Sequence, residues 1–152
     1  MNVKPLNILL ADDDSDDCYF FKKALEEIQI STQFTTVHDG EQLMEYLSGN
    51  SENLPDVLFL DINMPRKTGL ECLSEIKHTK KLKDLSVVIF STNNSQDTIS
   101  ILFKRGANIY ICKPGEFSHL KEVINHALAM AAEKYATSIY QSNSQVKYIL
   151  NA

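Results

Sequence analysis

The 152-residue sequence contains no tryptophan, only three cysteines and no long hydrophobic run. No apolar stretch approaches the roughly 20 residues that a membrane-spanning helix needs, and neither end carries a signal-peptide pattern. Cys18, Cys72 and Cys112 are too few and too widely spaced for a disulfide framework or a zinc site. We therefore expect a cytoplasmic protein without membrane contact, in which these cysteines are buried and reduced.

Basic residues are also scarce, because 15 Lys and Arg stand against 20 Asp and Glu and leave a formal net charge of -5. Proteins bind nucleic-acid phosphates mainly through clustered Lys and Arg, so we expect no direct DNA binding. The one basic cluster, residues 77–83, is more typical of a solvated helix end. The length suits one domain, which we place at residues 1–135. A C-terminal extension, 136–152, is expected to be partly helical or disordered and is too short for a DNA-binding module.

Five short apolar segments alternate with five amphipathic ones along the chain. The apolar segments have the length and composition of strands and lie at residues 6–11, 34–37, 57–60, 87–90 and 109–112. After each of them, apolar residues recur at spacings of three and four, as in helices that cover a sheet. Asp39 and Gln42 have the spacing of a capping box, and the last helix is expected to run from Phe117 to about Tyr140. Because parallel strands need crossover connections, this alternation predicts an α/β fold with a parallel sheet.

Polar residues with useful chemistry follow four of the five predicted strands. They are Asp12 and Asp13 after 6–11, Asp61 after 57–60, Ser91 after 87–90 and Lys113 after 109–112. The carboxyl ends of parallel strands meet along one edge of a sheet, where ligands bind in open α/β folds. Asp61 by itself is also explained as the opening of a turn before Pro65. Its coincidence with the other residues favours a functional site.

The chemistry of this set follows from its charges. Two carboxylates about 4 Å apart repel by roughly 4 kcal/mol at an effective dielectric near 20, so three of them call for a cation. Oxygen ligands alone favour Mg²⁺. Lys113 adds a positive charge and Ser91 a hydroxyl donor. Together these groups suit phosphoryl transfer onto an aspartate, with Asp61 as the nucleophile.

These residues, together with Met64-Pro65, Gly69, Thr92, Tyr110 and Pro114, resemble the response-regulator receiver domain of two-component signalling, of the chemotaxis-regulator type. The resemblance covers about residues 6–133. It implies a flavodoxin-like, doubly wound α/β fold with five helices around a five-stranded parallel sheet of order 2-1-3-4-5. It also implies a stand-alone receiver that accepts a phosphoryl group on Asp61 from a sensor histidine kinase or histidine phosphotransfer protein. Such a chain catalyses its own phosphorylation and dephosphorylation but is primarily a signalling protein.

The resemblance further assigns a role to each residue of the set. Asp12, Asp13, Asp61 and the backbone carbonyl of Asn63 would hold Mg²⁺, while Lys113, Ser91 and Thr92 would bind the phosphoryl group or respond to it. Tyr110 would change rotamer with Ser91, although it also suits an edge-strand residue whose hydroxyl lies in water. The output would be a changed surface for a downstream protein partner. A homodimer would use the fourth helix, fifth strand and fifth helix, or the C-terminal extension.

The sequence departs from the family pattern at two positions. Thr68 stands where an acidic or amide residue is common, and Gly115 where a bulky apolar residue is usual. Asn63 and Asn93 are expected near the path of an attacking water and so to influence the lifetime of the phosphoryl group. An alternative is a pseudo-receiver that acts as an interaction scaffold without phosphorylation. An aspartate-nucleophile phosphatase is a poorer fit, because that chemistry needs a carboxylate at position 63.

Overall fold

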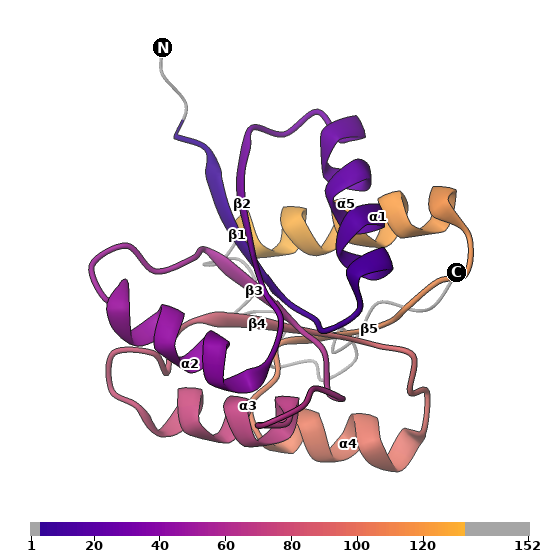
Figure 1. Ribbon diagram of the computed structural model, residues 1–152. Coiled ribbons are helices and arrows are strands. Elements are labelled where there is room, and N and C mark those ends of the chain that lie inside the picture. Colours follow the sequence, from indigo (N-terminus) through magenta and orange to yellow (C-terminus); the bar gives the residue numbers. More distant parts are fainter. Residues whose placement is uncertain (1–3, 133–152) are drawn as a thin grey trace.

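The computed structural model describes residues 4–132, which form a five-stranded parallel sheet between two layers of helices (Figure 1). The strands are β1 (Leu6–Ala11), β2 (Thr32–Val37), β3 (Val57–Leu60), β4 (Ser86–Ser91) and β5 (Ile109–Cys112). The helices are α1 (Ser15–Glu27), α2 (Gly40–Gly49), α3 (Gly69–His78), α4 (Gln96–Lys104) and α5 (Phe117–Ala132). The expected extension, 136–152, and the continuation of the last helix to Tyr140 lie outside the described residues.

The strand order is β2-β1-β3-β4-β5, which confirms the predicted flavodoxin-like topology. The strand β2 begins two residues earlier than expected, because Thr32 pairs with Leu6 at the start of β1. As its polar sequence predicts, β2 lies at an edge of the sheet, and β5 forms the other edge.

The two faces of the sheet are covered by different helices. Alternate residues of β1 show this: Ile8 and Leu10 pack in a core with α1 and α5, whereas Leu9 and Ala11 pack in a core with α2, α3 and α4. Figure 1 shows the same division, with α1 and α5 on one side and α2, α3 and α4 on the other. Burial of both strand faces explains the uninterrupted apolar runs in the sequence. None of the described helices is long and apolar enough to span a membrane.

Local capping residues fix where the helices near the site begin. The Asp14 carboxylate accepts hydrogen bonds from the backbone of the first turn of α1, at Asp16 and Asp17. Thr68, the first departure from the family pattern, caps α3 and forms a complete capping box with Glu71. A hydroxyl at position 68 therefore has a structural reason.

The second predicted capping box is only half formed. The Asp39 carboxylate accepts a hydrogen bond from the backbone nitrogen of Gln42 at 2.8 Å, as expected. The Gln42 side chain, however, accepts from the backbone nitrogen of His38 rather than from that of Asp39, at 2.8 Å. The helix start is correct, but the reciprocal bond reaches one residue further back.

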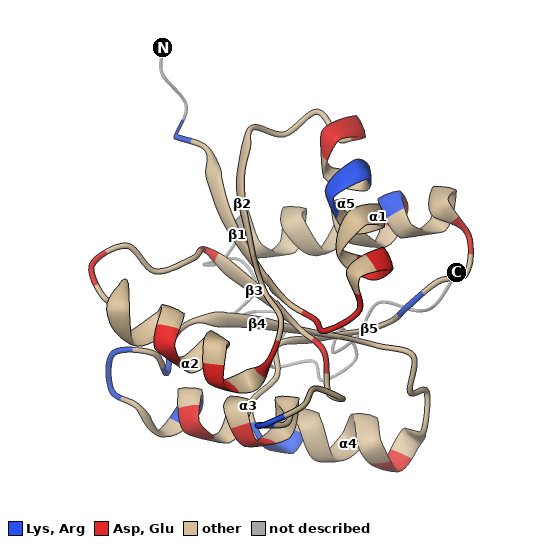
Figure 2. Cartoon of the chain, viewed as in Figure 1, with Lys and Arg blue, Asp and Glu red and all other residues tan. Residues whose placement is uncertain are grey.

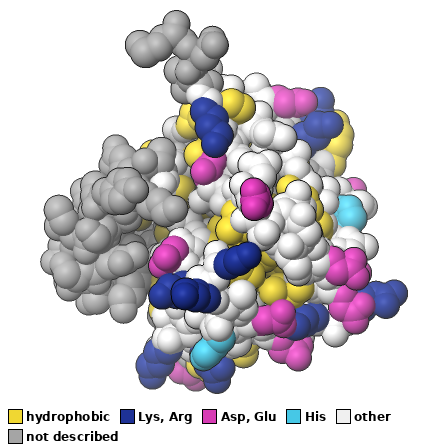
Figure 3. Space-filling model, turned by 90° about the vertical axis from the view of Figure 1, so that its left-hand side faces the viewer, with side chains coloured by type: hydrophobic (Ala, Val, Ile, Leu, Met, Phe, Trp, Pro, Cys, Tyr) yellow, Lys and Arg dark blue, Asp and Glu magenta, His cyan; other side chains and the backbone are white. Residues whose placement is uncertain are grey.

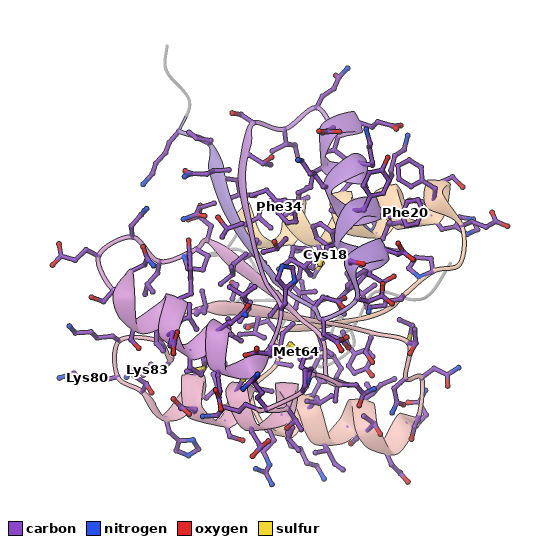
Figure 4. All side chains as sticks on the ribbon, in the orientation of Figure 1. Cys18, Phe20, Phe34, Met64, Lys80 and Lys83 are labelled. Carbon is purple, nitrogen blue, oxygen red and sulfur yellow. The ribbon has the colours of Figure 1, made fainter. Side chains whose placement is uncertain are left out.

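The basic cluster of residues 77–83 is not wholly solvated, which corrects one expectation. Lys80 and Lys83 project outward from the loop after α3 (Figure 4). Lys77, by contrast, is half-buried, and its ammonium donates to the backbone carbonyl of Leu85 at 3.0 Å. Burial lowers the Lys77 pKa. On the coloured part of the face in Figure 3, acidic and basic side chains are interspersed, as expected of a solvated surface.

Candidate functional site

The parallel pairing of β1 with β3 places Asp12 and Asp61 side by side. Ala11 pairs with Leu60, so the residue after each strand emerges at the same edge, and the Asp61 backbone nitrogen donates to the Ala11 carbonyl at 3.0 Å. Figure 2 shows acidic segments at the ends of β1 and β3 and a basic segment just after β5. The sheet therefore gathers charged residues that lie far apart in the sequence.

Three carboxylates form a cluster at this edge. Ligand atoms of Asp12, Asp13 and Asp61 all lie within 4.8 Å of one another. Asp12 is fully buried and Asp61 is 6% exposed, whereas Asp13 faces solvent. Within residues 4–132, the buried Oδ2 atom of Asp12 has the Lys113 ammonium as a close neighbour at 2.9 Å, although not in hydrogen-bond geometry. An all-oxygen cluster with a buried carboxylate and one open side fits a hard divalent cation such as Mg²⁺.

Lys113 supplies the positive charge of the cluster. Its Nζ atom lies 2.9 Å from Asp12 Oδ2, 2.7 Å from Asp17 Oδ2 and 3.4 Å from Asp61 Oδ2. The Lys113 side chain is only 10% exposed, and its ammonium also lies 5.3 Å from the centroid of the Phe90 ring. One ammonium group therefore faces three carboxylates, so the site carries excess negative charge even before Asp13 is counted.

The pKa values of these groups follow from burial and pairing. Burial raises the Asp61 pKa from 3.8 to about 6, against the opposing attraction of Lys113. Burial also raises the Asp12 pKa. Burial opposes the charge of Lys113, but the interactions with the Asp12 and Asp17 carboxylates outweigh it and hold the lysine pKa above its usual value. At neutral pH, Asp61 is thus mostly ionised, and Lys113 is charged.

Gly69 allows the start of α3 to pack against the Asp61 backbone. A Cβ atom at position 69 would lie 2.2 Å from the Asp61 carbonyl oxygen, which is an impossible contact. The Gly69 backbone nitrogen donates to the Ile62 carbonyl at 2.8 Å. Within the same loop, the Asn63 backbone nitrogen lies 3.4 Å from Asp61 Oδ1, which places Asn63 beside the carboxylate. Only glycine is compatible with this close approach.

The backbone of Asn93 connects Ser91 to Tyr110. The Ser91 hydroxyl accepts from the Asn93 nitrogen at 3.1 Å, and the Tyr110 hydroxyl donates to the Asn93 carbonyl at 2.6 Å. Tyr110 is fully buried, and burial raises its pKa to about 12. The alternative that its hydroxyl lies in water is therefore wrong, because α4 and the loop before it cover this edge strand.

Of the two remaining predicted residues, Ser91 lies beside the cluster and Thr92 does not contact it. Ser91 is fully buried, and its carbonyl accepts from the Lys113 backbone nitrogen at 2.8 Å, so these two residues are adjacent. The Thr92 side chain is exposed. No hydrogen bond or ion pair among the described residues joins Thr92 to the carboxylates.

Two residues lie near the carboxylate cluster although the sequence does not predict them there. Asp17 had a sufficient local explanation, since an acidic residue in the first turn of a helix complements the helix dipole. Its contact with Lys113 spans 96 residues, so no local pattern reveals it. The His38 ring Nδ1 lies 3.2 Å from the Asp12 carbonyl oxygen, because β1 and β2 are paired.

All three cysteines are free and buried, as expected. Burial raises the pKa of the Cys18 and Cys72 thiols to about 11. The protonated thiols are poor nucleophiles at neutral pH, so the chemistry of the site lies with its oxygen and ammonium groups.

The chain is similar to known proteins in sequence and in fold. The family model described as response regulator receiver domain matches residues 8–125. Response regulator Rcp1 of Synechocystis is 30% identical over 124 residues, which cover 79% of this chain and 84% of the relative. Among solved structures, the phosphorylated cyanobacterial phytochrome response regulator RcpA has a TM-score of 0.77 at 32% identity and covers 85% of this chain and 95% of its own. The Mn²⁺-bound form of Rcp1 has a TM-score of 0.72 at 28% identity, over 78% of this chain and 91% of its own.

Proposed function

Because the chain belongs to the response regulator receiver family, we propose that Asp61 accepts a phosphoryl group in a Mg²⁺-dependent reaction. The observation that carries this proposal is the position of Lys113, whose buried ammonium lies within 3.4 Å of the Asp61 carboxylate beside a cluster of three acidic groups. The donor is a sensor histidine kinase or a histidine phosphotransfer protein, and the setting is the cytoplasm.

The proposed cation ligands are Asp12, Asp13, Asp61 and the backbone carbonyl of Asn63. Mg²⁺ bound there would neutralise the carboxylates and the oxygens of the incoming phosphoryl group. The similar structures support this assignment, since one of them holds Mn²⁺ and another is phosphorylated. The buried Asp12 Oδ2 supports it as well, because among the described residues its charged neighbour, Lys113, is shared with the carboxylates of Asp17 and Asp61.

In the transfer step, an Asp61 carboxylate oxygen forms a bond to phosphorus while the bond from phosphorus to the donor's imidazole nitrogen breaks. The electron pair of the broken bond stays on that nitrogen. Lys113 balances the charge that develops on the phosphoryl oxygens, and burial limits competition from water. The product is an acyl phosphate on Asp61, with more negative charge than the carboxylate that it replaces.

The signal then travels through Ser91 and Tyr110. When the Ser91 hydroxyl donates to the phosphoryl group and the serine moves toward it, its bond with the Asn93 nitrogen is lost. The Asn93 carbonyl is the acceptor of the Tyr110 hydroxyl, so this loop and the tyrosine shift together. The altered surface is formed by α4, β5 and α5, where a downstream protein or a second copy of the chain binds. The extension, 136–152, is the second candidate for such a contact.

The test is to incubate the full chain with Mg²⁺ and acetyl phosphate and to measure its intact mass. We expect one phosphate adduct in the wild type and in Asp97→Asn, an exposed acid of α4, but none in Asp61→Asn. Chelation of Mg²⁺ should abolish the adduct. If the wild type stays unmodified while a known receiver is labelled, the chain acts as an interaction scaffold instead.

A further inference from the structure

Asp17, at the start of α1, is the nearest acidic partner of Lys113. The Lys113 ammonium donates to Asp17 Oδ2 at 2.7 Å but to Asp61 Oδ2 only at 3.4 Å. We propose that Asp17 is a positioning residue that holds Lys113 partly away from Asp61 until the phosphoryl group arrives. This inference rests on the proposed function and extends the phosphorylation switch to α1.

Backbone hydrogen bonds anchor both members of this pair. The Asp17 nitrogen donates to the Asp14 carboxylate at 3.1 Å, and the Lys113 nitrogen donates to the Ser91 carbonyl at 2.8 Å. The backbone positions are thus fixed by the helix cap and by the end of β4. Only the side chains need to move when the pair separates.

Asp17 is also the partner from which Lys113 separates most easily. Its side chain is 35% exposed, whereas that of Asp12 is fully buried and that of Asp61 is 9% exposed. A released Asp17 carboxylate regains water, so its loss of the lysine costs little. Release of Lys113 from the buried Asp12 would leave a charge unpaired in the core, which is far more costly.

The surroundings leave room for the lysine to shift. A pocket of about 350 Å³ opens beside the pair, and both Asp17 and Lys113 line it together with Phe20, Phe90 and Phe117. In Figure 4, Phe20 extends from α1 on the side of the loop that leads into α5. Gly115 also lines the pocket, and a Cβ atom there would meet nothing within 4 Å. The pocket therefore leaves free space beside the Lys113 side chain.

Phosphorylation changes which acceptor Lys113 prefers. In the resting chain, the ammonium is shared among the three carboxylates of Asp12, Asp17 and Asp61. The acyl phosphate adds about one negative charge and new acceptor oxygens at Asp61, while Asp17 stays as it was. The stronger acceptor then draws Lys113 from Asp17. The free energy of one partly exposed ion pair is lost in this step, so Asp17 disfavours the phosphorylated state by that amount.

The neighbouring Asp16 separates this role from a simple effect of helix charge. Asp16 lies in the same first turn, is exposed, and has the same favourable interaction with the helix dipole. Its side chain makes no hydrogen bond or ion pair within the described part of the chain. Asp16→Asn therefore matches Asp17→Asn in charge and position without touching Lys113.

The experiment measures the binding of beryllium fluoride, a phosphoryl mimic, to the full chain at saturating Mg²⁺ by isothermal titration calorimetry. We expect Asp17→Asn and Asp17→Ser to bind the mimic roughly two- to five-fold more tightly than the wild type, the range of a partly exposed ion pair. Asp16→Asn should bind as the wild type does, and Asp17→Glu, which keeps the charge, should restore wild-type affinity. Damage to the fold would weaken binding, so a tighter complex cannot result from it.

Two results overturn the inference while leaving the proposed function intact. The first is that the Asp17 variants bind no more tightly than Asp16→Asn, and the second is that they bind more weakly, which would mean that Asp17 orients Lys113 toward the phosphoryl group. Absence of Mg²⁺-dependent binding in the wild type is a different outcome. It removes the proposed function, and the inference with it.

Discussion

Replacement of Asp61 by asparagine should stabilise the resting protein. Asp61 is 6% exposed, and burial raises its pKa from 3.8 to about 6 despite the nearby Lys113. The folded chain therefore prefers the neutral acid at this position, and asparagine has the size and neutrality of that acid. The proposed function requires a carboxylate here, so the wild-type fold would retain a charge that weakens it.

The size and pH window of this effect follow from the two pKa values. A rise from 3.8 to about 6 corresponds to about 3 kcal/mol, since each pH unit by which a pKa moves is worth about 1.4 kcal/mol. Because the folded pKa is raised, the unfolded state releases its proton first. Stability is therefore lost as the pH rises from about 4 to about 6. We expect Asp61→Asn to gain about 1 to 3 kcal/mol above pH 7 and almost nothing below pH 4, since an amide replaces a neutral acid imperfectly.

The assay is urea unfolding of the wild type and Asp61→Asn from pH 4 to pH 8, without divalent cations, followed by circular dichroism. Glu52→Gln, an exposed site in the loop after α2, controls for the change in net charge and should shift stability by less than about 0.5 kcal/mol. Added Mg²⁺ should stabilise the wild type more than the variant and so narrow their difference. An equal gain at every pH, or no gain at all, would refute the electrostatic reasoning.

Two further predictions concern residues that shape the site. Gly69→Ala should destabilise the fold by about 2 kcal/mol or more, because its Cβ would lie 2.2 Å from the Asp61 carbonyl oxygen. The matched substitution Gly115→Ala, where a Cβ meets nothing within 4 Å, should change stability by less than about 0.5 kcal/mol in the same urea assay. Tyr110→Phe should cost about 1 kcal/mol, because it removes the partly buried hydrogen bond to the Asn93 carbonyl. A Tyr110→Phe variant as stable as the wild type would show that this bond contributes nothing to the resting state.

The strand ends were predictable because their position depends only on the order of strands and helices. Once a parallel sheet is inferred, Asp12, Asp61 and Lys113 must lie at one edge, whatever the details of packing. The orientation of Tyr110 was not predictable in the same way. All four residues of β5 are buried, so the strand has no polar and apolar alternation to show which face meets solvent. The loop that covers β5 fixes the orientation of Tyr110, because the Asn93 carbonyl accepts the hydrogen bond of its hydroxyl.

Some residues make long-range contacts that could not be predicted, because a local role already explains their place in the sequence. The residues around position 17 already satisfy the rules for a helix start, so nothing was left for a long-range contact to explain. Lys77 is a second residue whose contacts the local sequence does not reveal. The sequence places it in a cluster of lysines that is typical of an exposed helix end, yet its ammonium donates to the backbone carbonyls of Lys83 and Leu85 in the loop before β4. In both cases, the tertiary fold brings in a partner that sequence spacing cannot predict.

The balance of charge at the site explains why the resting fold and the proposed activity oppose one another. Among the residues that the structure describes, a single ammonium, on Lys113, faces Asp12, Asp17 and Asp61, and a fourth carboxylate, Asp13, lies at the open side. Neutralisation by a second lysine would stabilise the fold but would leave no unmet demand for a cation. With one lysine, the excess negative charge favours a cation, and a bound Mg²⁺ would then make the additional charge of the proposed phosphoryl group tolerable. The instability predicted for the wild type without Mg²⁺ and the proposed capacity for phosphorylation thus have the same physical origin.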